Sequence, residues 1–215
     1  MLVGNVEIKW LGHDSFRITD VLEKRVIYID PFQLTGGEKA DIILITHSHY
    51  DHCSIADLKK ISTPKTVILA PADCQSSFQG KVDCRDAVIM NPGHNVTMGN
   101  IHVEAVPAYN TNKRFHPKDN DWVGYVIDLN SKRIYHSGDT DFIPEMANLH
   151  KIDIALMAVS GTYVMTAEEA AKAVETFKPK LAIPMHYGSI VGDSNDAETF
   201  KKLSKVPVEI LKKEG

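Results

Sequence analysis

The stretch Thr46-His47-Ser48-His49-Tyr50-Asp51-His52 places three imidazoles and a carboxylate directly after an apolar run at residues 42–45. His47 and His49 are two residues apart, so in an extended backbone their side chains leave on the same side and can hold one ion. Asp51 and His52 follow where the chain is expected to turn into a helix, which lets them face a second ion beside the first. The stretch therefore predicts a metal site.

The ligand types indicate an open, catalytic site rather than a structural one. Imidazole and carboxylate suit zinc, manganese, iron or nickel, and the usual marker of structural zinc, a thiolate, is not among these ligands. The alternative is that histidines in a polar loop form hydrogen bonds to backbone groups and bind no metal. Three histidines with an aspartate at this spacing favour metal binding. Asp51 would hold one ion and orient the nucleophile, so it is the predicted catalytic residue.

Composition indicates one globular unit. With 215 residues, of which 43% are hydrophobic, the chain can build a sizeable core, and we expect a single domain over residues 1–215. A formal charge of −4 gives no general attraction to nucleic acid or to an anionic membrane. The chain shows neither a signal-type N-terminus nor a run of about 18 apolar residues.

Location and assembly follow less directly from the same composition. Cys53, Cys74 and Cys84 are scattered and odd in number, which indicates reduced thiols. We therefore expect a cytoplasmic protein with a small-molecule partner, and we leave self-association into a homo-oligomer open.

The hydrophobic pattern predicts a layered α/β fold. Residues 6–29 show short alternating runs with turns between them, which is typical of an antiparallel meander, and strands alternate with helices after residue 40. The expected later strands are 42–45, 66–69, 88–90, 96–98, 101–106, 122–129, 133–136, 154–159, 181–185 and 206–211, and the expected helices are 54–61, 71–78, 166–177 and 196–203.

Two further ligand candidates stand at strand ends. Asp139 follows the expected strand 133–136 and a glycine, where a carboxylate can bridge two cations. His186 ends the apolar strand 181–185 and suits either a core position or a ligand position. Both residues would bring a metal-binding group to the edge of a sheet.

Substrate contacts are predicted from a local basic cluster and two isolated residues. The loop 110–121 contains Lys113, Arg114 and His116, which either form a solvated hairpin tip or hold an anionic group such as phosphate. His13 ends the first long strand, and Tyr109 ends the strand before the loop. We treat all five residues as candidates for substrate binding.

Several of these motifs resemble one family. Residues 47–52 are similar to the H-x-H-x-D-H signature of the metallo-β-lactamase superfamily, Gly138-Asp139-Thr140 resembles its Gly-Asp-Thr motif, and His186 resembles its final histidine ligand. Residues 12–16 are similar to the opening motif of the branch that contains ascorbate-6-phosphate lactonases and N-acyl-phosphatidylethanolamine phospholipase D-like enzymes. The resemblance implies a four-layer αββα sandwich. It also implies two divalent ions that share Asp139, with His186 joining Asp51 and His52 at the second ion.

The sequence departs from this family at one ligand. Where most members have a third histidine for the first ion, Tyr109 or Asn110 stands here. Three outcomes are open: His13 or His116 supplies the ligand from elsewhere, water takes its place, or only one ion binds tightly.

The resemblance and the ligand set together predict a metal-dependent hydrolase. A metal-activated hydroxide would attack a phosphodiester or a sugar-phosphate lactone, with zinc favoured and manganese, nickel or iron as alternatives. Two other functions stay open, namely an iron-dependent oxidoreductase of sulfur or oxygen chemistry and a non-catalytic metal-binding protein.

Overall fold

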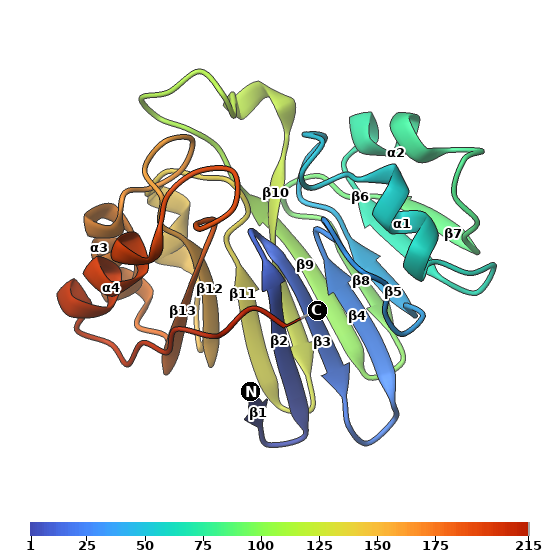
Figure 1. Cartoon of the computed structure of the whole chain (residues 1–215), viewed down its shortest axis with the longest axis horizontal. Helices are drawn as coiled ribbons and strands as arrows, with labels where there is room; N and C mark the ends of the chain where they lie inside the picture. Colours follow the sequence, from blue (N-terminus) through green and yellow to red (C-terminus); the bar gives the residue numbers. More distant parts are fainter. Residues whose placement is uncertain (215) are drawn as a thin grey trace. The chain divides into compact units, whose positions relative to one another are not determined.

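The computed structural model describes residues 1–214 of the chain. They form two compact units, one made of residues 1–90 with the C-terminal residues 212–214, and the other of residues 91–211. Each unit contains one β-sheet and two α-helices (Figure 1). That a single domain spans residues 1–215 stays a prediction.

The first unit is built on a seven-stranded sheet whose strands lie in chain order. Strands β1 to β4 pair antiparallel, and β4 to β7 pair parallel. The elements are β1 (Leu2–Val3), β2 (Val6–Gly12), β3 (Ser15–Asp20), β4 (Arg25–Ile29), β5 (Ile42–Leu44), α1 (Ile55–Ile61), β6 (Val67–Ala70), α2 (Ala72–Phe78) and β7 (Asp86–Ile89).

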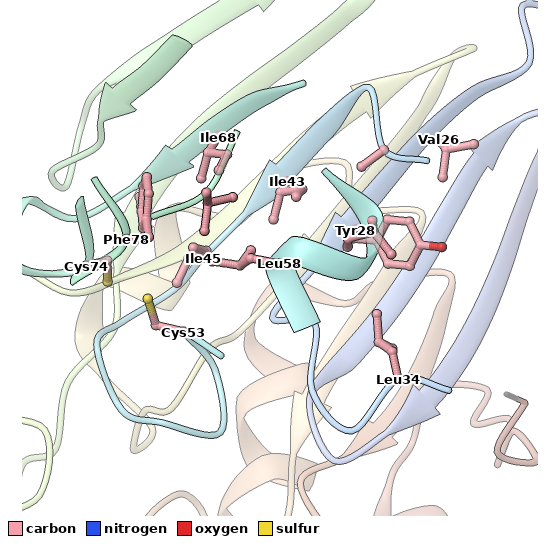
Figure 2. Close-up of a cluster of buried hydrophobic side chains, with 14 residues drawn as sticks. Val26, Tyr28, Leu34, Ile43, Ile45, Cys53, Leu58, Ile68, Cys74 and Phe78 are labelled. Carbon is pink, nitrogen blue, oxygen red and sulfur yellow. The ribbon is translucent and has the colours of Figure 1, made fainter. Parts of the chain in front are cut away.

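Apolar side chains join the two helices of the first unit to its sheet (Figure 2). Ile43 and Ile68 of the parallel strands pack in one buried cluster with Leu58 of α1 and Phe78 of α2. Burial of such side chains contributes roughly 1.5–3 kcal/mol each. This core therefore fixes the strand β5 from which the residues 46–52 emerge.

The second unit repeats this plan on a six-stranded sheet in the order β13-β12-β11-β10-β9-β8. Strands β8 to β11 are antiparallel, and β11 to β13 are parallel. The elements are β8 (Asn95–Met98), β9 (Ile101–Pro107), the 3-10 helix η1 (Lys118–Asn120), β10 (Val123–Leu129), β11 (Lys132–His136), the 3-10 helix η2 (Pro144–Asn148), β12 (Ile154–Ala158), α3 (Ala167–Phe177), β13 (Leu181–Met185) and α4 (Ser194–Leu203).

The shared plan places candidate ligands at equivalent strand ends. In each unit an antiparallel group of strands leads into parallel strands, and a helix follows two of the parallel segments. The residues 46–52 follow β5, Asp139 follows β11, and His186 follows β13. Loops at strand ends are where a rigid scaffold commonly presents functional side chains.

Most of the expected elements are confirmed, with boundaries that differ by at most two residues. Thr166 caps α3 in a full capping box, as its sequence predicts. Helix α4 begins earlier than expected because Asp193 and Asp196 form another capping box. Within residues 1–214, none of the helices is long and apolar enough to cross a membrane.

The expected strand 206–211 is wrong. The segment makes one isolated bridge to β13, between Ala182 and Val208. Ala182 N donates to Pro207 O, and Glu209 N donates to Ala182 O. Pro207 has no N–H to extend the ladder, so the pairing ends after one bridge.

Candidate metal centre

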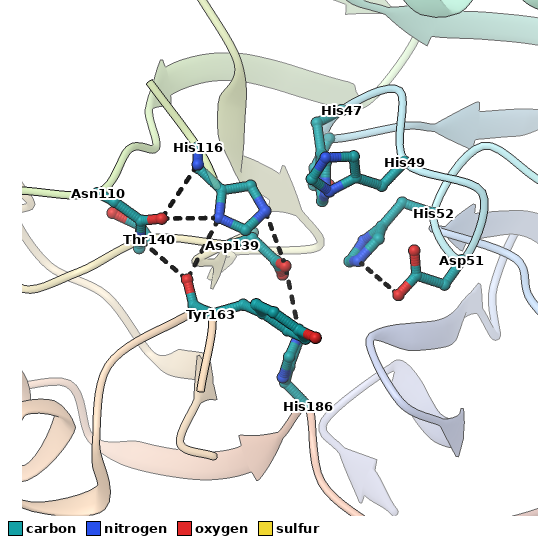
Figure 3. Close-up of polar contacts among 12 residues, drawn as sticks. His47, His49, Asp51, His52, Asn110, His116, Asp139, Thr140, Tyr163 and His186 are labelled. Atoms are coloured by element: carbon teal, nitrogen blue, oxygen red, sulfur yellow. Dashed lines mark hydrogen bonds and ion pairs between the residues drawn. The ribbon is translucent and has the colours of Figure 1, made fainter. Parts of the chain in front are cut away.

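In the first unit, the loop after β5 gathers the histidines of the opening motif. His47 and His52 are buried, while His49 and Asp51 are partly exposed. His47 Nε2 lies 3.0 Å from His49 Nδ1 (Figure 3). The two-residue spacing therefore brings two imidazole nitrogens to one point, as the sequence predicts.

Asp30 at the end of β4 connects this loop to the neighbouring strand. It is fully buried and has a φ of 43°, and its carboxylate accepts from Thr46 N at 2.8 Å and from Thr46 Oγ1 at 2.6 Å. His52 Nδ1 lies 2.8 Å from the same carboxylate. Sequence reasoning missed this residue, although an acidic side chain ending the strand next to β5 is a usable signal.

These bonds assign a proton position to two imidazoles. A carboxylate only accepts hydrogen bonds, so Nδ1 of His52 carries the proton that faces Asp30. Thr46 Oγ1 donates its one hydrogen to Asp30, so it accepts from His47 Nδ1 at 3.0 Å. His47 and His52 therefore both leave Nε2 as the nitrogen that could hold a metal ion, which is the arrangement that outer hydrogen bonds commonly impose on metal-binding histidines.

The turn after β2 adds two more ligand-type side chains. His13 has a φ of 50°, and its Nε2 lies 3.1 Å from Asp51 Oδ2. Asp14, which sequence reasoning missed, has a carboxylate oxygen 3.7 Å from His52 Nε2. One ligand atom from each of His13, Asp14 and His52 lies within 4.8 Å of the others. Both residues are buried and stand beside the histidine loop.

The environment of Asp51 favours its charged form. Burial on its own raises the pKa of this carboxyl. The hydrogen bond from His13 and the charges of His52 and His13 lower the pKa by more than burial raises it, so the pKa lies below its ordinary value. An ionised carboxylate is the form that binds a cation.

In the second unit, three predicted residues form one cluster around a carboxylate oxygen. Asp139 Oδ2 lies 3.2 Å from His116 Nε2 and 3.2 Å from His186 Nε2 (Figure 3). All three side chains are at least 96% buried. Asp139 and His186 were predicted as ligands, whereas His116 was predicted chiefly as a substrate contact.

Asn110, one of the two residues that stand where a third histidine was expected, holds His116 in place. Its amide nitrogen donates to Asp141 Oδ1 at 3.1 Å and to Tyr163 O at 2.8 Å, which fixes the orientation of the amide. Asn110 Oδ1 then accepts from the backbone N of His116 at 3.0 Å. Asn110 therefore orients a histidine that lies later in the same loop.

The contacts of His116 direct its Nε2 atom at a carboxylate. His116 Nδ1 faces two acceptors, Asn110 Oδ1 at 3.0 Å and Tyr163 O at 3.2 Å, so Nδ1 carries a proton. Nε2 then faces the Asp139 carboxylate, an approach that a proton or a metal ion between the two atoms stabilises. With imidazole nitrogens and carboxylate oxygens grouped in each unit, the donor set fits a divalent ion.

The remaining predicted substrate contacts are engaged elsewhere. Lys113 Nζ donates to the buried Asp141 at 2.5 Å. Tyr109 OH donates to Glu145 at 2.8 Å and accepts from Lys118 Nζ at 3.2 Å. Arg114 is exposed. The expected basic cluster is therefore neutralised at Lys113 in the folded chain.

The family of the chain follows from comparison with known proteins. A model described as "Beta-lactamase superfamily domain" matches residues 7–186, so the chain belongs to this superfamily. The predicted superfamily is thus confirmed. The particular branch suggested by residues 12–16 stays a prediction.

Relatives cover nearly the whole chain. The chain is 36% identical to a UPF0173 metal-dependent hydrolase of Pyrococcus abyssi and 37% identical to one of Thermococcus onnurineus, each over 96% of both chains. A solved Parabacteroides distasonis protein, proposed to be a metal-dependent hydrolase, is 34% identical and gives a TM-score of 0.84 over 96% of this chain and 94% of that one. The predicted α/β fold of the metallo-β-lactamase type is confirmed.

Proposed function

We propose that this chain uses metal-activated water to hydrolyse a small anionic substrate, either a phosphodiester or a sugar-phosphate lactone. The observation that carries the proposal is the position of Asp139 Oδ2 at 3.2 Å from two imidazoles, in a chain that also holds His47 against His49. A carboxylate in contact with two imidazoles is suited to bridge two ions.

The proposed ligands divide between two divalent ions. His47, His49 and His116 would hold the first ion, and Asp51, His52 and His186 the second, with Asp139 shared. His116 takes the place of the missing third histidine because its Nε2 faces Asp139. Zinc is the favoured metal because all ligands are imidazole or carboxylate, and the same donors also accept manganese, nickel or iron.

The bound ions would supply one chemical property, a lowering of the pKa of water from about 16 toward neutrality. The residues of the chain supply the rest. Asp51, held by His13 at 3.1 Å, would orient the attacking water. His13 is placed to transfer a proton through the same contact, whereas the Tyr109 hydroxyl is bonded to Glu145 and Lys118.

The test begins with protein stripped by a chelator and reloaded with zinc, manganese, nickel or iron. We expect hydrolysis of an aryl phosphodiester or of a phosphorylated aldonolactone to disappear on stripping and return on reloading. Asp51→Ala should lower kcat at least about 100-fold, because it removes both a ligand and the orienting carboxylate. Asp86→Ala, which changes an exposed aspartate, should leave kcat unchanged.

Other outcomes would support the alternatives. Hydrolysis that survives complete metal removal would contradict the proposal. Oxygen uptake by the iron-loaded protein without hydrolysis would favour the iron-dependent oxidoreductase. Tight metal binding without turnover on any substrate would favour the non-catalytic metal-binding protein.

A further inference from the structure

The loop 110–121 presents an aromatic side chain while two of its lysines are neutralised. Lys113 is paired with Asp141 at 2.5 Å, and Lys118 with Glu145 at 2.9 Å. Between them, Phe115 is 48% exposed. A substrate that approaches this loop therefore meets an apolar ring, with Arg114 as the exposed cation beside it.

Phe115 is held in a fixed position against a second ring. Its centroid lies 4.6 Å from that of Tyr163, and the two planes are 79° apart. An edge-to-face pair of this kind restrains both rings and leaves one apolar face open. Single exposed hydrophobic residues are common on proteins, but this one both contacts a second ring edge to face and is adjacent in sequence to a proposed ligand.

The aromatic pair is tied to the proposed metal ligands. Tyr163 O lies 3.2 Å from His116 Nδ1 and accepts from Asn110 Nδ2 at 2.8 Å. Figure 3 shows Tyr163 beside the cluster of His116 and Asp139. The pair therefore stands next to the groups that would act on a substrate, in a geometry that the same hydrogen bonds maintain.

We propose that Phe115 and Tyr163 determine specificity by binding a flat apolar group, aromatic in the simplest case, attached to the bond that is hydrolysed. This inference rests on the proposed function and narrows it, because a sugar-phosphate lactone has no such group whereas an aryl phosphodiester has one. Arg114 would pair with the negative charge of the phosphodiester.

The test compares two phosphodiesters that release the same leaving group. The zinc-loaded enzyme is assayed on bis(p-nitrophenyl) phosphate and on methyl p-nitrophenyl phosphate. The kcat/KM of the first substrate divided by that of the second measures how much the second aromatic ring contributes to specificity. We expect Phe115→Ala to lower this ratio roughly fivefold, mainly through KM. Phe115→Tyr should keep the ratio, because it keeps the ring. Leu22→Ala, a change at an exposed residue between β3 and β4, should also keep it.

A binding measurement separates this inference from the proposed function. Calorimetry compares phenylphosphonate with methylphosphonate, which have no ester to hydrolyse, and we expect tighter binding of the phenyl compound to be lost in Phe115→Ala. If the enzyme shows no turnover but this binding difference is found, the proposed binding of an apolar group by Phe115 and Tyr163 is supported and the hydrolase proposal fails. If hydrolysis occurs while Phe115→Ala changes neither the ratio nor the binding difference, the proposed role of Phe115 and Tyr163 in specificity is contradicted.

Discussion

Asp30 occupies a backbone conformation that few residues tolerate, and its contacts show why. A φ of 43° is allowed for aspartate or asparagine at modest cost, but it is unfavourable for most other side chains. In this conformation the carboxylate meets Thr46 and His52 at the same time. The strain is thus offset by hydrogen bonds that orient two imidazoles.

Replacing Asp30 by asparagine tests this role at the scale of one residue. Asparagine keeps the shape and tolerates positive φ, so Asp30→Asn removes the charge while leaving the backbone in place. We expect the affinity for zinc to fall roughly 10- to 100-fold, because the protons on His47 and His52 are no longer fixed. Competition against a chelator of known affinity measures the change.

The control for this measurement is Asp128→Asn, which alters a half-exposed ion pair with Arg133. We expect it to leave zinc affinity unchanged. Equal zinc affinity of the Asp30→Asn variant and the unaltered protein would show that Asp30 supports only the fold.

Site residues that lie close together in the sequence are easier to predict than site residues that strand pairing brings together. His47, His49 and His52 follow from one heptapeptide. Asp30 and Asp14 belong to the same cluster only because β4 pairs with β5 and the turn after β2 reaches the loop. Such neighbours are far apart in sequence, so the spacing within the heptapeptide does not identify them.

At the scale of elements, an aspartate in the first turn of α1 binds the helix to the loop after β4 through hydrogen bonds. Ser54 caps the helix by accepting from the backbone N of Asp57, but the carboxylate of Asp57 does not bond back to the backbone N of Ser54 to form a capping box. Its carboxylate instead accepts from Ser54 Oγ and from the backbone N of Gln33 and Leu34, at 2.6, 2.9 and 3.0 Å. Lys60 adds an ion pair at 2.8 Å. The side chain therefore connects the helix to the loop after β4.

The pH dependence of this connection is predictable. Burial alone raises the pKa of Asp57, but bonds from Lys60, Ser54, Leu34 and Gln33 outweigh it, and the folded pKa lies below the value of 3.8 taken for an unperturbed aspartate. A depressed folded pKa stabilises the native state above pH 3.8, and this contribution is lost as the pH falls through the folded pKa.

We therefore expect Asp57→Asn to lower the free energy of unfolding by about 1–3 kcal/mol at pH 7, with a smaller loss at pH 3. Urea unfolding at the two pH values measures the difference. Asp86→Asn, which changes an exposed ion pair, should shift the free energy by less than about 0.5 kcal/mol at either pH. An equal loss for Asp57→Asn at both pH values would mean that its charge contributes nothing.

At the scale of the whole molecule, periodicity predicts most elements but not the plan that relates the two units. Alternating runs and caps identify strands such as β2 to β4 and helices such as α3. The repeat of antiparallel and parallel strands in each unit leaves no residue-level repeat in the sequence, because a sheet can be built from many apolar sequences. The type of fold therefore required the resemblance of a few motifs.

The missing third histidine also shows the limit of motif reading. The sequence at Tyr109 and Asn110 indicates a lost ligand. In the folded chain, the loop returns so that His116 meets Asp139, and Asn110 orients it. The length and course of a loop decide this outcome, and neither can be predicted from spacing within a motif.

The measurement that tests the central claim most directly is the zinc content of the reloaded and desalted protein, determined by mass spectrometry. We predict about two zinc ions per chain, falling to about one in His116→Ala. His102→Ala removes a histidine of β9 that contacts Thr97, and it should keep both ions. Absence of bound zinc in the unaltered protein, or an unchanged zinc content in His116→Ala, would contradict the proposed metal centre.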